Sequence, residues 1–183
     1  LDARAQATLV APSTWMADQA RATWGGQVRV RVIPYGVDTG VFRPLDRQQA
    51  RIVLDLPAGG RFLLVVADRL AAPRKGVSLL LESLDRRPPD VGVILVGVGD
   101  GGAAAPLRVH ELGPIHDERL LALAYAAADA VVVPSLEDNL PNVLLEGLAC
   151  GRPLVGFRAG GIPDAIEPGV TGELADSLDA AGL

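Results

Sequence analysis

The feature of this sequence that most constrains its fold is the alternation of short aliphatic runs with helical patterns, separated by Gly and Pro. Such runs are typical of strands buried on both faces, and their alternation with helices predicts a doubly wound, mostly parallel α/β sheet. The expected strands span 7–10, 28–33, 62–67, 91–96, 107–112, 130–133 and 154–157. The expected helices span 13–24, 47–54, 76–84, 117–127, 142–149 and a short piece at 162–167.

Composition narrows the class of protein further. Of the 183 residues, 49% are hydrophobic and only 4% aromatic, so the core must be aliphatic. The net charge of −5 argues against a nucleic-acid-binding protein, which would show a basic face. One cysteine excludes an internal disulfide framework and a zinc site built on several cysteines. Without a signal peptide or an apolar run near the ~20 residues that span a bilayer, we expect a cytoplasmic α/β domain.

The two ends of the sequence suggest a longer protein. The chain begins at Leu1 rather than at a start methionine, and residues 176–183 (DSLDAAGL) are read as a helix that has barely begun. We therefore expect this chain to be a piece of a larger polypeptide.

The loops that follow the strands are where chemistry is expected. In open parallel sheets, ligands bind beyond the carboxyl ends of the strands. Here those loops span 68–75, 97–102, 113–116 and 134–141.

The densest group of polar residues follows the strand at 130–133. A helix is predicted to start near Pro141, and its first amides, with the helix dipole, form a site for an anion. Glu146 lies about one turn inside this helix, where its carboxylate can accept hydrogen bonds from a ribose diol. Asp138, on the preceding loop, can do the same for a sugar. The alternative is that these acids are ordinary helix caps.

The loop at 68–75 carries two candidate phosphate ligands, Arg69 and Lys75. Of the 17 basic residues, 16 are arginine, and Lys75 is the only lysine. A lysine ammonium is a natural point-charge partner for phosphate, so both side chains are predicted to neutralise a pyrophosphate. The alternative is a pair of solvated loop cations. Arg74 is expected to face solvent without a role.

Several other motifs carry less information. Gly97, Gly99 and Gly102 match G-x-G-x-x-G, but Pro106 and the next strand leave no room for the helix of a dinucleotide fold, so a hydride-transferring oxidoreductase is rejected. Gly97 and Gly99 instead let the backbone approach a ligand closely, or make a turn. The remaining expectations are a tight turn at Gly160–Gly161, no metal site at His110 and His116, and a buried, unreactive Cys150.

Five stretches together resemble the C-terminal, donor-binding domain of family 4 (group 1) retaining glycosyltransferases of the GT-B architecture. They are VIPYGVDTGVFRP (32–44), ADRLAAPRKGVSLLLESL (67–84), ILVGVGDG (94–101), ELGPIHDERLLALAYAAADAVVVPS (111–135) and the block 134–172. The resemblance implies a Rossmann-like fold, the C-terminal half of a GT-B enzyme. It implies one donor-binding domain over 1–183, with 1–27 near the interdomain junction, and an N-terminal acceptor domain and C-terminal tail outside this chain.

The resemblance also implies roles for individual positions. Arg69 and Lys75 would bind the donor diphosphate. Asp138 and Glu146 would take the first and last acidic positions of the E-x₇-E motif, contacting the transferred sugar and the nucleotide ribose. The further implied donor contacts are the backbone amides of Asn142 and Val143 on phosphate, the loop from Gly113 to Ile115 beside the base, and Gly36 near the domain interface.

The implied activity is transfer from a UDP-, GDP- or ADP-sugar with retention of configuration, without a required metal or other cofactor. The acceptor would be a sugar, a lipid-linked sugar or a small molecule, and lipid acceptors would bring peripheral attachment at the inner membrane face through the missing domain. The isolated chain would turn over poorly. The alternative is a non-catalytic, nucleotide-sugar-binding regulatory module on the same scaffold.

This sequence departs from the family pattern at the site itself. The first acid of the motif is Asp138 rather than Glu, and the adjacent Glu137 is an alternative sugar ligand in a shifted register. Pro141 and Asn142 replace the commoner Gly-Ile/Leu, so Pro141 offers no N–H to phosphate. Tyr35 replaces the usual Asn before Gly-Val-Asp.

Overall fold

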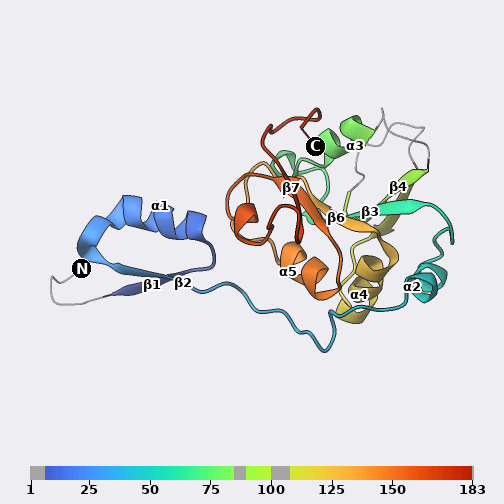
Figure 1. Cartoon of the computed structure of the whole chain (residues 1–183), viewed down its shortest axis with the longest axis horizontal. Coiled ribbons are helices and arrows are strands. Elements are labelled where there is room, and N and C mark those ends of the chain that lie inside the picture. Colours follow the sequence, from blue (N-terminus) through green and yellow to red (C-terminus); the bar gives the residue numbers. More distant parts are fainter. Residues whose placement is uncertain (1–6, 85–89, 100–107, 183) are drawn as a thin grey trace.

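A computed structural model describes residues 7–84, 90–99 and 108–182 of this chain (Figure 1). Its strands form two sheets, and every pairing between neighbouring strands is parallel. The smaller sheet joins β1 (Thr8–Ala11) to β2 (Arg29–Val32). The larger has the order β5 (Arg108–Gly113), β4 (Val91–Val98), β3 (Arg61–Arg69), β6 (Ala130–Val133), β7 (Leu154–Phe157) and β8 (Gly172–Ala175).

The strand order of the larger sheet fixes where a ligand can bind. Counted from β3, it is the doubly wound order 3-2-1-4-5-6, in which the chain direction across the sheet reverses between β3 and β6. These two strands pair only at Leu63–Ala130 and Leu64–Val131, near the start of each. The loops that leave the carboxyl ends of β3 and β6 lie at this switch point.

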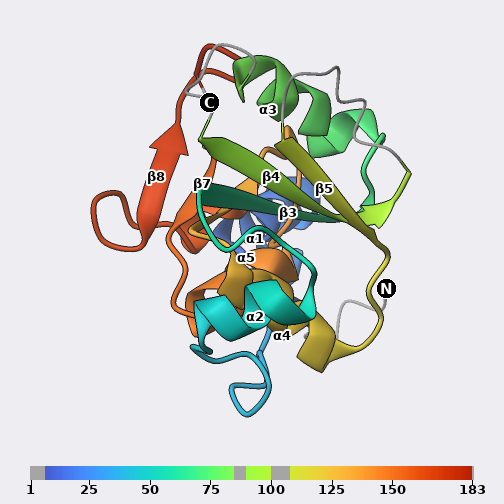
Figure 2. The same ribbon diagram turned by 90° about the vertical axis from the view of Figure 1, so that its right-hand side faces the viewer.

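Helices cover both faces of this sheet (Figure 2). On one face α3 (Val77–Leu84) packs against Val65, Val93, Leu95 and Val132. The other face is covered by α2 (Arg47–Val53), α4 (Glu118–Ala127) and α5 (Asn142–Ala149). Side chains of successive strand residues point alternately to the two layers, so both faces of β3, β4 and β6 are apolar. The aliphatic, doubly wound fold that the sequence predicts is confirmed.

The unit of β1, α1 (Thr14–Trp24) and β2 lies to one side of the six-stranded body and continues into it through an extended segment (Figure 1). The start of α1 contacts the body. The fully buried Ser13 hydroxyl accepts a hydrogen bond from Met16 N and donates one to Asn139 Oδ1 at 2.6 Å. Thr14 N donates to the carboxylate of Asp164. One serine thus caps α1 and fastens it to the loop after β6.

Replacing Ser13 with alanine is expected to reduce the free energy of unfolding by about 1–2 kcal/mol, because the cap of α1 and a buried hydrogen bond disappear together. Both tryptophans of the chain, Trp15 and Trp24, lie in α1, so urea unfolding followed by tryptophan fluorescence reports this unit directly. Ser78→Ala, at an exposed position of α3, is the control. Equal losses in the two variants would contradict the role of Ser13.

Most element boundaries agree with the sequence prediction to within one to three residues, but some elements and pairings differ. The 3₁₀ turns Gly25–Gln27 and Pro73–Lys75 were not predicted. The strand β8, which pairs with β7, was not predicted. The strands β1 and β2 pair only with each other rather than extending the larger sheet. The short helix expected at 162–167 is a single 3₁₀ turn, Ile162–Asp164.

The helix expected over 176–183 is wrong for the described part of that segment. Residues 176–182 form bends and a turn. The carboxylate of Asp179 accepts hydrogen bonds from Ser177 Oγ, Ala181 N and Gly182 N. Short polar side chains that bind nearby backbone amides compete with helix formation. Here the hydrogen bonds of Asp179 stabilise a turn in place of a helix.

Candidate functional site

The loops after β3 and β6 are joined by backbone contacts at the switch point. Leu136 N donates a hydrogen bond to Arg74 O at 2.8 Å. Gly76 has φ +63°, and a Cβ at that position would lie 1.9 Å from Pro134 O. Only glycine combines this left-handed backbone with so close an approach. Gly76 therefore lets the loop that carries Lys75 dock against the end of β6.

Lys75 meets Asp138 across this junction. Its Nζ lies 2.8 Å from Asp138 Oδ2, and each side chain is only 16% exposed. Arg74 Nη1 is 3.7 Å from the same oxygen but 55% exposed, so its solvent-facing position is confirmed although it is not free of contacts. The adjacent Glu137 is exposed. Of the two neighbouring acids, Asp138 is the one whose carboxylate faces the lysine.

The loop around Asp138 is held by further contacts. Asn139 N donates to Asp138 Oδ1 at 2.9 Å, and Gly161 N donates to Asp138 O at 3.0 Å. The turn expected at Gly160–Gly161 therefore packs directly against this loop, a contact that the sequence analysis did not foresee.

The helix α5 begins without a side-chain cap. The helices α1, α2 and α4 are each capped by a side chain, from Ser13, Asp46 and Asp117, whereas the residue before α5 is Pro141. The first amides of α5, those of Asn142 and Val143, donate no hydrogen bond to the side chain of any residue that the structure describes. The positive end of this helix dipole is therefore available to an anion.

Glu146 lies one turn into α5 and has a hydrogen-bond donor beneath it. The hydroxyl of the fully buried Tyr125 donates to Glu146 Oε2 at 2.6 Å. Burial raises the pKa of the Glu146 carboxyl, the Tyr125 hydrogen bond opposes that rise, and the nearby Glu118 carboxylate adds to it. Burial, reinforced by Glu146, raises the pKa of Tyr125 well above its usual value. The phenol therefore remains a proton donor throughout the physiological range.

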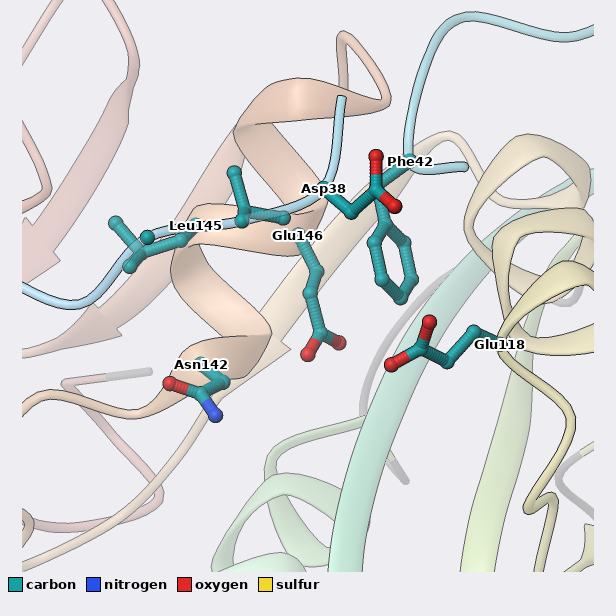
Figure 3. A pocket seen from close by; sticks show the side chains of 8 residues that line it. Asp38, Phe42, Glu118, Asn142, Leu145 and Glu146 are labelled. Atoms are coloured by element: carbon teal, nitrogen blue, oxygen red, sulfur yellow. The ribbon is translucent and has the colours of Figure 1, made fainter. Parts of the chain in front are cut away.

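A pocket of about 120 Å³ opens beside Glu146, and Figure 3 shows its labelled side chains. The carboxylates of Glu146 and Glu118 point toward each other across it, and Asn142 lies beside Glu146. The pocket joins α4, α5 and the segment between β2 and α2. Its lining residues are Gly36, Val37, Asp38, Phe42, Glu118, Asn142, Leu145 and Glu146.

Three other residues predicted to contact the donor, Arg69, Gly113 and Ile115, do not line this pocket. Arg69, at the end of β3, is exposed and makes no side-chain hydrogen bond or ion pair with any described residue. Gly113, at the end of β5, has space around it, and Ile115 packs against the core. Neither of the two lines the pocket described above.

The two described glycines of the G-x-G-x-x-G match differ from each other. Gly97 has φ +149°, and a Cβ there would lie 1.9 Å from Ala67 O, so this glycine serves the packing of β4 on β3. Gly99 has open space around its Cα. Gly102 lies outside the described residues.

His110 contacts a core aromatic ring, and Cys150 is part of the core. The ring of His110 packs edge-on against Phe62, and no cluster of metal-binding side chains occurs within residues 7–84, 90–99 and 108–182. Cys150 is fully buried at the end of α5, and burial raises the pKa of its thiol to about 11. An inert, buried thiol agrees with the sequence prediction.

The sequence analysis gave no role to three residues of this region: Glu118 and Asp38, which line the pocket, and Tyr125, which donates a hydrogen bond to Glu146. Tyr125 falls in an alanine-rich helical run, where an aromatic residue is expected to serve only the core. Asp38 was part of the quoted segment 32–44 but was given no role. Among the described helices, none has the length and hydropathy needed to cross a bilayer.

Comparison with known proteins decides the family. A family model for group 1 glycosyl transferases matches residues 61–183. This chain belongs to that family. Relatives of the group 1 chain include the D-inositol 3-phosphate glycosyltransferase of Acidothermus cellulolyticus, 33% identical over 98% of this chain and 45% of the relative. The same enzyme of Segniliparus rotundus is 34% identical over 81% of this chain and 36% of the relative.

Solved structures resemble this group 1 chain as well. Sucrose-phosphate synthase from Thermosynechococcus elongatus matches with a TM-score of 0.81 and 28% identity, over 96% of this chain and 46% of that one. Anabaena HepE, in complex with UDP-glucose, matches with a TM-score of 0.77 and 26% identity, over 97% of this chain and 52% of that one. The chain spans about half the length of these proteins, or less, and has the Rossmann-like fold of GT-B glycosyltransferases.

Proposed function

We propose that residues 1–183 form the donor-binding domain of a retaining glycosyltransferase that takes its sugar from a nucleoside diphosphate. One observation carries the proposal: Lys75 pairs with Asp138 in the loop that leads into the uncapped start of α5, and Glu146 lies one turn into that helix, beside a pocket. An ammonium and the uncapped amides of a helix start suit a diphosphate, and a carboxylate suits the ribose diol. The UDP-glucose complex of Anabaena HepE supports the same ligand class.

The proposed chemistry follows from where charge develops. When the bond between the anomeric carbon and the phosphate oxygen breaks, negative charge grows on the leaving diphosphate. Lys75, Arg69 and the amides of Asn142 and Val143 would stabilise it, so we propose that transfer requires no metal. A preorganised donor of this kind contributes typically about 3–4 kcal/mol to transition-state stabilisation.

The rest of the enzyme belongs to the proposal too. An N-terminal domain would bind the acceptor and close over the donor, which excludes water and aligns the reactants. In this arrangement Gly36 and the Gly113–Ile115 loop would lie near the donor, with the loop beside the base. A cytoplasmic location, with attachment to the inner membrane face if the acceptor is lipid-linked, completes the proposal.

A thermal-shift screen with UDP, GDP, ADP and their glucose conjugates tests donor binding, because a ligand bound only by the folded state raises the melting temperature. We expect one nucleoside diphosphate and its sugar to raise it more than the other two. No shift from any of the six compounds would contradict the proposal. Glycosyl transfer or donor hydrolysis by the full-length protein would distinguish an enzyme from a binding module.

Because Lys75 contacts Asp138, removal of the Asp138 charge is expected to strengthen, not weaken, the binding of an anion. A diphosphate must compete with the Asp138 carboxylate for the ammonium, so Asp138→Asn is expected to tighten pyrophosphate binding about three- to tenfold at low salt. Calorimetric titration measures the change. Glu137→Gln removes the same charge one residue away without touching Lys75 and serves as the control. Equal gains in both variants would mean that only net charge matters.

A further inference from the structure

The carboxylate proposed to bind ribose is held by one neighbouring hydroxyl. Glu146 Oε2 accepts the Tyr125 hydroxyl at 2.6 Å, the one side-chain hydrogen bond of Glu146 among the described residues. Tyr125 lies on α4 and Glu146 on α5, so the bond joins two helices that cover the same face of the sheet. The position of this carboxylate therefore depends on α4 as well as on its own helix.

Tyr125 is itself immobilised. Its side chain is fully buried, and its ring meets that of Phe42 edge-on, with 6.0 Å between the centroids and an interplanar angle of 81°. Phe42 lines the pocket directly, whereas Tyr125 does not. The phenol is thus a buried donor that contacts Glu146 but does not line the pocket.

Another glutamate of the pocket, Glu118, opposes ionisation of Glu146 and raises its pKa. Glu118 lies seven residues before Tyr125, two turns along α4, and its carboxylate faces Glu146. Asp38, from the segment before α2, lines the same pocket. Like charges favour a protonated or displaced Glu146. The Tyr125 hydroxyl is the neighbour that favours an ionised carboxylate in its observed position.

We infer that Tyr125 is a positioning residue that holds the Glu146 carboxylate, ionised and correctly oriented, for the ribose of the donor. This inference rests on the proposed function. The phenol occupies one lone pair of Oε2, which leaves Oε1 and the second lone pair of Oε2 for two ribose hydroxyls. Because the phenol and carboxylate are already paired, little side-chain ordering remains to be done when the nucleotide binds.

A double-mutant cycle tests the inference. Tyr125→Phe keeps the buried ring and removes only the hydroxyl, and we expect it to weaken binding of the preferred nucleotide among UDP, GDP and ADP roughly fivefold. Pyrophosphate, which has no ribose, should bind as tightly to the variant as to the wild type. In a Glu146→Gln background the same change should have little further effect, because Tyr125 acts through Glu146.

The pH dependence provides a readout that a merely structural role would not move. The Tyr125 hydrogen bond lowers the pKa of Glu146, so its removal raises that pKa further. Ribose binding uses the ionised form, and affinity therefore falls as the pH drops through this pKa. In Tyr125→Phe that fall should occur at higher pH. Each comparison uses the same nucleotide, so ionisation of the ligand cancels. The Cys150 thiol, with a pKa of about 11, stays neutral over the range.

The outcomes separate this inference from the proposed function. If wild-type protein binds pyrophosphate but none of the three nucleotides more tightly, the proposed ribose role fails. If the wild type binds one nucleotide and Tyr125→Phe binds it equally well, with the same pH profile, the inference is overturned. Parallel losses of nucleotide and pyrophosphate in Tyr125→Phe would also overturn it, since they would reflect general disruption of the pocket.

Discussion

Lys75→Ala is expected to weaken binding of pyrophosphate and of the preferred nucleoside diphosphate about 100-fold. This loss corresponds to a binding free energy of about 3 kcal/mol, the upper range for a hydrogen bond to a charged group. Two effects act in the same direction. The ammonium that would meet the phosphates is lost, and the Asp138 carboxylate, 2.8 Å from it, is left without its closest cation in the path of an incoming anion. Calorimetric titration at fixed ionic strength measures both ligands.

Arg74→Ala is the matched control for this experiment. Arg74 is the adjacent cation, and it is 55% exposed and 3.7 Å from Asp138, so its loss should cost only a few-fold. The double variant Lys75→Ala, Asp138→Asn separates the two contributions, because it removes the repelling carboxylate together with the ammonium. Equal losses in Lys75→Ala and Arg74→Ala would refute the assignment of Lys75 to phosphate.

The fold could be predicted because it depends on local patterns. The strands Ala130–Val133 and Leu154–Phe157 and the helix Asn142–Ala149 coincide with the predicted ranges. Short aliphatic runs next to Pro favour strands, whereas a longer apolar run that starts after Pro and ends before Gly favours a helix. The strand β8 escaped prediction because Gly172–Ala175 is short and contains Gly and Glu. Its strand conformation comes from pairing with β7, a long-range contact that no local pattern encodes.

The pairing of β1 with β2 could not be predicted either, because it is also a long-range contact. Hydrophobic periodicity identifies a strand but not its neighbour in the sheet. Their pairing with each other alone, and the attachment of α1 to the loop after β6 through Ser13 and Asn139, are tertiary facts. Ser13 was recognisable as a residue at the start of a helix, but its second partner lies 126 residues away.

The candidate site was predictable in its members more than in its contacts. The rule that ligands bind beyond the carboxyl ends of strands selected the loops of Lys75 and Asp138, and the strand order then brought these two loops together. The direct contact between the lysine and the acid could not be foreseen, because spacing along the chain does not say which side chains pair. Tyr125 was overlooked because a core aromatic residue and a buried hydrogen-bond donor look alike in sequence.

Glu146→Gln is expected to weaken binding of the preferred nucleoside diphosphate about 30-fold. Glutamine keeps the shape of the side chain, but its neutral amide accepts weaker hydrogen bonds than a carboxylate, and its NH₂ group cannot accept any from the ribose diol. Calorimetry with UDP, GDP and ADP measures the loss, in parallel with the corresponding nucleosides.

Pyrophosphate is the control ligand for Glu146→Gln. It has no ribose, and the Glu146 carboxylate repels it, so its affinity for Glu146→Gln should be unchanged or slightly higher. Glu118→Gln removes a carboxylate from the other side of the same pocket without removing the proposed ribose ligand. It should leave nucleotide binding near the wild-type value, or improve it as Glu146 loses a repelling neighbour. A loss of pyrophosphate binding in Glu146→Gln as large as the loss of nucleotide binding would exclude a ribose role for this residue.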